Sequence, residues 1–233
     1  SRIAHGSTSI TTSLLQYELD SNASDLKSYT STNNIIRSYE LGIKALDEIE
    51  EFINEYGNNC DFKRVDSFLY TSKDIEIKEI EEEYKFRKEN GFPVEFIEAK
   101  DNPFSFNIKA GVLSKGGGAQ LDPYRFTHAL LDVGCKKGLE VYENTEVVGT
   151  KYSEDGVTVE TIYGHKVKGK IVIVATGYNT RLFSKRTFGV KSTTFNVASK
   201  PINNIKDIYK GVVIRDNKKP YNYLRTTSDN RLI

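Results

Sequence analysis

The chain has 233 residues, 38% of them hydrophobic, which is enough for one large domain or two smaller ones with their own cores. Its 33 Lys and Arg nearly balance its 32 Asp and Glu, so no net basic field favours nucleic acid or an anionic membrane as a partner. No run of about 18 apolar residues predicts a membrane span. Cys60 and Cys135 lie far apart and fit neither a disulfide framework nor a zinc site. We therefore expect a cytoplasmic protein.

Both ends of the chain look like positions inside a longer protein. Methionine does not occur, the chain opens in a segment rich in Gly, Ser and Thr, and residues 231–233 resemble the start of a strand. We expect an internal fragment. The hydroxyl-rich segment 5–13 has two interpretations, a plain loop with a helix cap or a loop that contacts a phosphate or a ring.

The first half of the chain predicts long helices and strands. Apolar residues spaced near 3.6 predict an amphipathic helix over 33–56, closed by Gly57. A second, highly charged helix is predicted at 74–90, with Asp74 at its start and Gly91 after its end. Extended segments are predicted at 65–70, 94–97 and 104–113.

Residues 115–119 contain three consecutive glycines after a lysine, which predicts a flexible turn. The Walker pattern is absent, so a nucleotide loop is not indicated. Asp122 and Pro123 then open a helix that runs to about Lys137, with Asp as the N-cap and Pro at the first helical position. Strands are predicted at 139–142, 144–150, 156–163 and 167–174.

The segment 171–180, with the sequence IVIVATGYNT, begins with four consecutive aliphatic residues. Such a run predicts a strand buried on both faces, as in the centre of a layered α/β sheet. The small residues 175–177 would let a ligand approach the main chain at the carboxyl end of that strand. The alternative is a core strand followed by an ordinary turn.

These segments together resemble a known family. The sequence GAQLDPYRF at 118–126, its helix, GLEVY at 138–142, TEV at 145–147 and the strand at 171–174 resemble the FAD-dependent oxidoreductases of the D-amino acid oxidase and glycine oxidase superfamily. The resemblance implies an α+β fold, in which a mixed or antiparallel substrate-domain sheet is covered by the helices at 33–56 and 74–90. Part of an FAD-binding domain, an α/β remnant of the ββα type, accompanies this sheet.

The resemblance also implies an order of domains. We expect a flavin-domain loop remnant at 1–32, the first part of the substrate domain at 33–121, an FAD-binding part at 122–190 and the second part of the substrate domain at 191–233. The substrate sheet is expected to use segments near 65–70, 94–97, 104–113, 192–200 and 221–227.

Cofactor binding is expected in the full-length protein. The glycine-rich GxGxxG turn that takes the FAD pyrophosphate in this family is missing. We therefore expect residues 1–233 alone to hold no FAD. The resemblance assigns cofactor contacts to Ser7, Thr8, Ser9, Thr11, Thr12, Val147, Ala175, Thr176 and Gly177. Loop hydrogen bonding or core packing is the other explanation for each of them.

Tyr221, Tyr223 and Arg225 alternate along a predicted strand and would share one face. A guanidinium pairs bidentately with a carboxylate, so this face suits a substrate carboxylate. The competing interpretation is an exposed sheet face with a surface arginine. The three histidines show no metal-ligand spacing, and the sequence predicts neither a metal site nor a catalytic acid or base.

The function implied by the resemblance is oxidation of the C–N bond of an amino acid or secondary amine, with hydride transfer to the flavin. The expected partner is thus a small molecule. A second hypothesis is a non-catalytic ligand- or protein-binding domain without a cofactor, which the missing dinucleotide turn supports. A nicotinamide-dependent dehydrogenase is disfavoured, because the antiparallel strands before 171–174 resemble a flavin domain.

Overall fold

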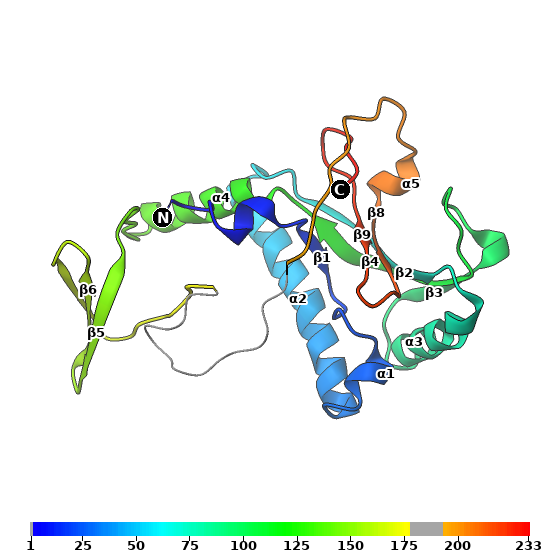
Figure 1. Ribbon diagram of the computed structural model, residues 1–233, viewed down its shortest axis with the longest axis horizontal. Coiled ribbons are helices and arrows are strands. Elements are labelled where there is room, and N and C mark those ends of the chain that lie inside the picture. The colour runs from blue at the N-terminus through cyan, green and yellow to red at the C-terminus, as the bar shows by residue number, and fades with distance from the viewer. Residues whose placement is uncertain (1, 178–192) are drawn as a thin grey trace.

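The computed structural model describes residues 2–177 and 193–233, which form two sheets (Figure 1). The larger sheet has six strands in the order β1-β4-β2-β8-β9, with β3 paired to the same edge of β4 as β1. Among the described strands, β2 and β8 are the only parallel neighbours. The expected α+β fold with a mixed sheet is therefore confirmed. The strands are β1 Leu14–Gln16, β2 Lys63–Thr71, β3 Val94–Glu98, β4 Ala110–Gln120, β8 Val212–Asp216 and β9 Tyr223–Leu224.

Two predicted helices pack against this sheet. Helix α2, Thr32–Tyr56, starts at Ser31, whose side chain accepts from the Asn34 amide at 3.3 Å, and ends at Gly57. Helix α3, Ile77–Glu89, follows a 3-10 turn, η2 Asp74–Glu76. The other helical segments are η1 Ser7–Ile10, α1 Ala23–Leu26, η3 Ala99–Asp101, α4 Pro123–Lys136 and α5 Asp207–Lys210. Within the described ranges, no helix has the length and apolar character needed to cross a membrane.

Successive side chains of β2 point to opposite faces of the sheet, and apolar side chains cover both of these faces. Leu69 packs with Ile80 of α3 and with Val112 of β4. Its neighbour Phe68 packs with Phe104 and Ile214 in a separate cluster. The residues at 104–109, predicted as extended, form no strand and instead contribute to this second cluster.

The flexible turn predicted at 115–119 is wrong, because these residues lie inside β4. Gly116 has a φ of +58°, which favours glycine, whereas Gly117 and Gly118 are required by close packing. A Cβ on Gly117 would stand 2.8 Å from the Ser114 Cβ and 2.9 Å from Tyr17 Cε1, and one on Gly118 would stand 2.6 Å from Val213 Cγ2. The glycine run thus lets neighbouring elements approach β4 closely.

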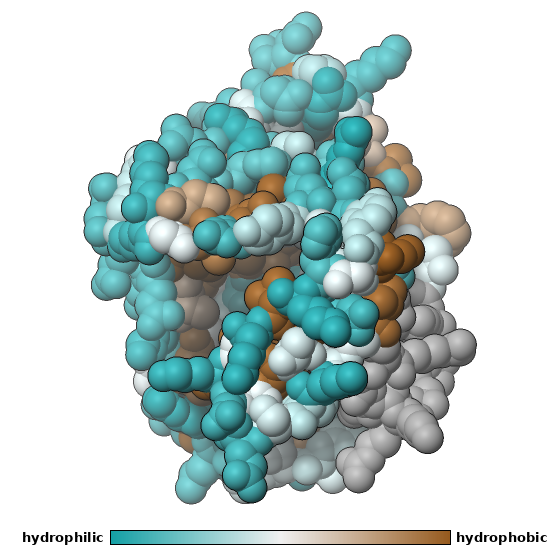
Figure 2. All heavy atoms as spheres, turned by 90° about the vertical axis from the view of Figure 1, so that its left-hand side faces the viewer, coloured by the Kyte–Doolittle hydropathy of each residue, from teal (hydrophilic) through white to brown (hydrophobic). Residues whose placement is uncertain are grey.

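The smaller sheet is antiparallel and lies apart from the larger one, beyond α4 (Figure 1). Its strands are β5 Val147–Ser153, β6 Gly156–Thr161 and β7 Lys166–Gly169. The two predicted antiparallel strands before residue 164 are found, with shifted boundaries. Figure 2 shows apolar side chains gathered between polar ones on the face of the molecule that carries this part of the chain.

Three predicted strands are wrong. Residues 139–142, 171–174 and 193–200 form no strand, and Ile171 and Ile173 are 82% and 85% exposed. A strand buried on both faces needs a hydrogen-bonded neighbour on each side. No part of the described chain pairs with residues 171–174, so their aliphatic side chains stay in solvent. Residues 178–180 and 192 of these predictions lie outside the described residues.

Candidate functional site

Two adjoining cavities lie where the N-terminal segment meets the C-terminal turn. The first, here called the Arg225 cavity, measures about 330 Å³, and the second, the tyrosine cavity, about 690 Å³. Thr11 and Ile233 line both. The Arg225 cavity is also lined by Thr8, Ser9, Gln120, Asp122, Tyr124 and Arg225. The tyrosine cavity is also lined by Thr12, Asp20, Phe195, Tyr221 and Tyr223.

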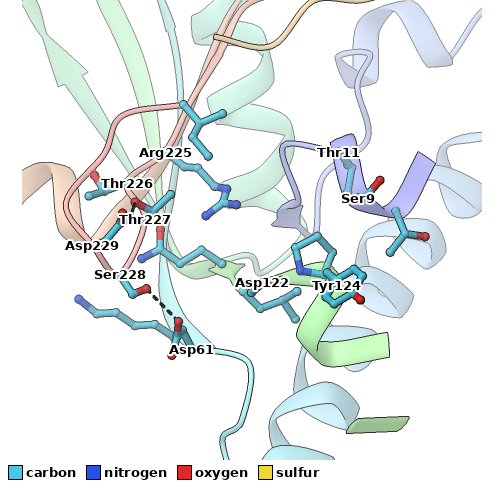
Figure 3. Close-up of a pocket in the computed structure, with 16 residues that line it drawn as sticks. Ser9, Thr11, Asp61, Asp122, Tyr124, Arg225, Thr226, Thr227, Ser228 and Asp229 are labelled. Atoms are coloured by element: carbon cyan, nitrogen blue, oxygen red, sulfur yellow. Dashed lines mark hydrogen bonds between the residues drawn. The ribbon is translucent and has the colours of Figure 1, made fainter. Parts of the chain in front are cut away.

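Arg225 is one of the charged residues that line the first cavity, and its side chain points toward the side where Asp122 and Tyr124 lie (Figure 3). Its side chain is almost fully buried, and its Nε donates to the carbonyl of Thr12. Within residues 2–177 and 193–233, no carboxylate lies within ion-pair distance of the guanidinium. Burial lowers the pKa of Arg225, and the nearby charge of Asp122 acts against this. A buried cation without a carboxylate is a natural anion-binding group.

Arg87, unlike Arg225, is a buried arginine that forms ion pairs inside the protein. It is fully buried, with Nε 2.7 Å from Glu83 Oε1 and Nη1 3.2 Å from Glu18 Oε1. Burial would lower the pKa of Arg87, but Glu83 and then Glu18 outweigh it and hold the pKa above its usual value. Its charge is thus neutralised inside the protein by two carboxylates, whereas Arg225 has no ion-pair partner among the described residues.

The wall opposite the C-terminal turn is polar. Asp122 caps α4, since its Oδ1 accepts from the Arg125 amide at 3.0 Å. Asp61 accepts from Ser228 Oγ at 2.9 Å and from Arg125 Nη1 at 2.8 Å, which ties the C-terminal turn to the start of α4 (Figure 3). Gln120, the last residue of β4, lies on the same wall, and its buried Oε1 has no partner among the described residues.

In the tyrosine cavity, a carboxylate binds both tyrosines. Tyr221 Oη donates to Asp20 Oδ2 at 2.6 Å, Tyr223 Oη donates to Asp20 Oδ1 at 2.5 Å, and the ring centroids are 4.7 Å apart. Burial and then the hydrogen bond to Asp20 raise the pKa of both tyrosines. The two hydroxyls therefore stay protonated and committed to Asp20. Arg225, expected on the same face, opens into the neighbouring cavity instead.

The predicted cofactor residues divide into two groups. Thr8, Ser9, Thr11 and Thr12 line the cavities, whereas Ser7, the first residue of η1, lines neither. Val147 pairs with Thr161 in the smaller sheet, and residues 175–177 lie in an irregular segment that follows this sheet in the chain. The structure brings together only the N-terminal threonines and serine with Arg225. Asp20 and Gln120 were not predicted, because nothing in their local sequence marks them.

These residues fit part of an FAD molecule. Hydroxyls from Thr8, Ser9 and Thr11 supply hydrogen-bonding groups suited to the polar edge of a flavin ring. The glycine-rich turn that takes a pyrophosphate is missing from the sequence. In the described part of the chain, no group of His, Cys, Asp and Glu is arranged to hold a metal ion, and Cys60 and Cys135 are free thiols.

Comparison with known proteins shows what the chain is similar to. Over 196 residues the chain is 24% identical to the putative Rieske 2Fe-2S iron-sulfur protein YhfW of Bacillus subtilis, covering 80% of the chain and 38% of that protein. Over 106 residues it is 31% identical to glycerol 3-phosphate dehydrogenase of Caloramator mitchellensis, covering 43% of the chain and 22% of that protein. The chain thus spans less than two-fifths of either relative.

The fold is similar to that of glycine oxidase from Bacillus cereus, with a TM-score of 0.72 and 17% identity, over 100% of this chain and 61% of that one. At this identity the likeness shows the fold alone. The family model for FAD dependent oxidoreductases matches residues 1–233. The chain therefore belongs to the FAD-dependent oxidoreductase family.

Proposed function

We propose that the complete protein containing residues 1–233 oxidises the C–N bond of an amino acid or a secondary amine. The observation that carries this proposal is Arg225, a buried guanidinium that opens into a cavity with no carboxylate partner among the described residues. An anionic substrate group would satisfy it, and a planar carboxylate matches its two-pronged geometry. The glycine oxidase fold of the chain supports an amino acid as the substrate.

The residues of the two cavities have different roles in this proposal. Arg225 binds and orients the substrate through its carboxylate. Asp20, Tyr221 and Tyr223 shape the neighbouring cavity as one hydrogen-bonded unit. Hydroxyls of Thr8 and Thr11 hold the polar edge of the flavin ring. FAD, when bound, supplies the acceptor for the hydride that leaves the substrate carbon.

The predicted domain order enters this proposal as well. We propose that 33–121 and 191–233 build the substrate side and that 1–32 and 122–190 belong to the cofactor side. Pairing of β8 with β2 supports the first assignment, because it places the two substrate segments in one sheet. Separation of the smaller sheet from the larger one supports placing 122–190 on the cofactor side (Figure 1). For 1–32 the pairing of β1 with β4 in the larger sheet supports no such separation.

Replacement of Arg225 tests the proposal. In the complete, FAD-loaded protein, Arg225→Ala is expected to weaken transition-state binding by roughly 2 to 5 kcal/mol, because it removes a desolvated charged contact. Arg225→Lys keeps the charge but loses the fork and should also weaken substrate binding, with FAD content unchanged. The matched control is Arg37→Ala, because Arg37 is an exposed residue of α2 and should change kinetics by less than about 0.5 kcal/mol.

Steady-state kinetics would be measured against glycine, N-methylglycine, proline and glycerol 3-phosphate. Unchanged kinetics in both Arg225 variants would show that Arg225 does not bind the substrate carboxylate. Turnover of glycerol 3-phosphate alone would instead make the substrate a phosphorylated alcohol, as the name of the Caloramator relative describes for that protein.

A further inference from the structure

We propose that Asp122 binds the positively charged nitrogen of the substrate, so that Asp122 and Arg225 together select a zwitterion within one cavity. The inference rests on the proposed function and deepens it, because it names the group that distinguishes an amino acid from a simple carboxylate. It also gives a second role to a residue that the sequence marks only as a helix cap.

One carboxylate oxygen of Asp122 is free to accept. Its Oδ1 accepts from the Arg125 amide at 3.0 Å and so caps α4, whereas its Oδ2 has no hydrogen-bond partner among the described residues. Asp122 is half-buried and lines the Arg225 cavity. The described chain buries several unpaired polar atoms, but Asp122 Oδ2 is not one of them, so a ligand can reach it. An ionised carboxylate only accepts, and its missing partner therefore carries an N–H or O–H.

The negative charge of Asp122 is also unpaired. Among the described residues, no lysine, arginine or histidine lies within ion-pair distance of its carboxylate. The two other aspartates that line the cavity differ: Asp61 pairs with Arg125 at 2.8 Å, and Asp229 pairs with Arg231 at 2.6 Å. Asp122 is thus the lining aspartate that favours a cation from outside the described chain.

Arg225 and Asp122 match the two ends of one small molecule. The charge of Asp122 acts to raise the pKa of Arg225, although burial, which lowers this pKa, is the larger cause. The two charges therefore interact, yet they form no ion pair with each other. Opposite charges held apart in a cavity of about 330 Å³ suit a zwitterion, whose carboxylate pairs with the guanidinium and whose ammonium group pairs with the aspartate. A simple carboxylate satisfies Arg225 alone.

Two ligands of the same shape test the proposal. 2-Aminoisobutyrate carries an ammonium group where pivalate carries a methyl group, and both have the same carboxylate. Neither has a hydrogen on the carbon next to the carboxylate, so neither can give up a hydride there. Affinities would be measured by calorimetry on the complete, FAD-loaded protein. A hydrogen bond between charged groups changes affinity about 10- to 100-fold, so the unchanged protein is expected to prefer 2-aminoisobutyrate by that factor.

Asp122→Asn removes the charge and keeps the cap, because Asn and Asp cap helices about equally well. We expect the preference to fall at least about tenfold, while the affinity for pivalate stays within about twofold. Asp122→Ser, which also caps a helix, replaces this variant if the asparagine variant does not fold. Asp132→Asn is the matched control, since Asp132 is an exposed residue of the same helix, lines neither cavity and should leave the preference unchanged.

Equal affinity for the two ligands in the unchanged protein, or binding of neither, overturns the inference, and this measurement needs no variant. A preference retained in Asp122→Asn overturns it as well, as does a fall in Asp61→Asn as large as that in Asp122→Asn. Arg225→Ala separates the two proposals. If that variant weakens both ligands while Asp122→Asn keeps the preference, the inference fails and the proposed function stands. If Arg225→Ala binds both ligands as the unchanged protein does, the proposed function fails.

Discussion

Gly42→Ala is predicted to destabilise the protein although alanine is the better helix former. Gly42 lies in the middle of α2, where an ideal Cβ would stand 2.4 Å from the carbonyl oxygen of Tyr17 and 2.8 Å from its Cα. Those are backbone atoms, so relief requires movement of the chain itself. Replacing glycine with alanine in a free helix would instead stabilise it by roughly 0.5–1 kcal/mol.

The position of Tyr17 decides which effect is larger. Its amide donates to Gly117 at 3.0 Å, its hydroxyl lies 3.2 Å from Ser114 Oγ, and its ring stacks on Phe92 with centroids 5.4 Å apart. Tyr17 is held on three sides and cannot move away cheaply. Overpacking costs typically 1–3 kcal/mol, and contact with fixed backbone places this site at the upper end. The net loss is therefore about 2 kcal/mol after the propensity gain.

Gly134→Ala is the matched control, because it makes the same change in another helix. The added Cβ would stand 2.9 Å from Leu139 Cδ2, and the Leu139 side chain is 48% exposed and can turn aside. We expect the control to be neutral or stabilising. Thermal unfolding of both variants is the assay, and a loss of 2 kcal/mol corresponds to roughly 4–8 °C for a chain of this size. A rise in melting temperature for Gly42→Ala equal to that of the control would refute the reasoning.

Three further predictions concern buried charge, the tyrosine pair and the cofactor. Arg87→Met leaves Glu18 and Glu83 buried without their cation and should cost about 3–5 kcal/mol in chemical denaturation, whereas Arg37→Met at an exposed ion pair should stay within about 0.5 kcal/mol. Burial is the largest cause of the raised pKa of Tyr221 and Tyr223, and the hydrogen bond to Asp20 is the second. Asp20→Asn removes the negative charge, so both tyrosines should form tyrosinate at lower pH in a near-ultraviolet difference titration. An unchanged titration would show that burial alone sets their pKa. Residues 1–233 purified alone should be colourless in a visible absorbance scan, because the pyrophosphate turn is missing; one flavin per chain would contradict this.

Elements that depend on local sequence were predictable. The 3.6 spacing and the flanking Ser31 and Gly57 define α2 without reference to any other segment. Elements that depend on neighbours were not. Glycines at 116–118 predict a turn when considered alone, yet they lie within β4, where Gly117 and Gly118 make close contacts with Tyr17 and Val213. The aliphatic run at 171–174 forms no strand, because the described chain provides none to pair with it.

The candidate site was predictable only in part, for the same reason. Family resemblance pointed to Thr8, Thr11 and Arg225, and the fold brings them to one pair of cavities. Asp20 gains its role from Tyr221, which is 201 residues away in the sequence. Gln120 stands out only because its side-chain oxygen is buried without a partner in the described residues. Neither relation leaves a mark in the local sequence.

The pairing of β8 with β2 sets the order in which the protein is completed during synthesis. Asp66 lies opposite Val212, so this edge of β2 stays unpaired during synthesis until β8 has been made. The contact of Arg225 with Thr12 joins residues 213 positions apart, so the cavities close only after Arg225 has been synthesised. Such distant contacts slow folding. A nascent chain stalled before β8 would expose an unpaired strand edge to other chains, which makes that stage the most exposed to aggregation.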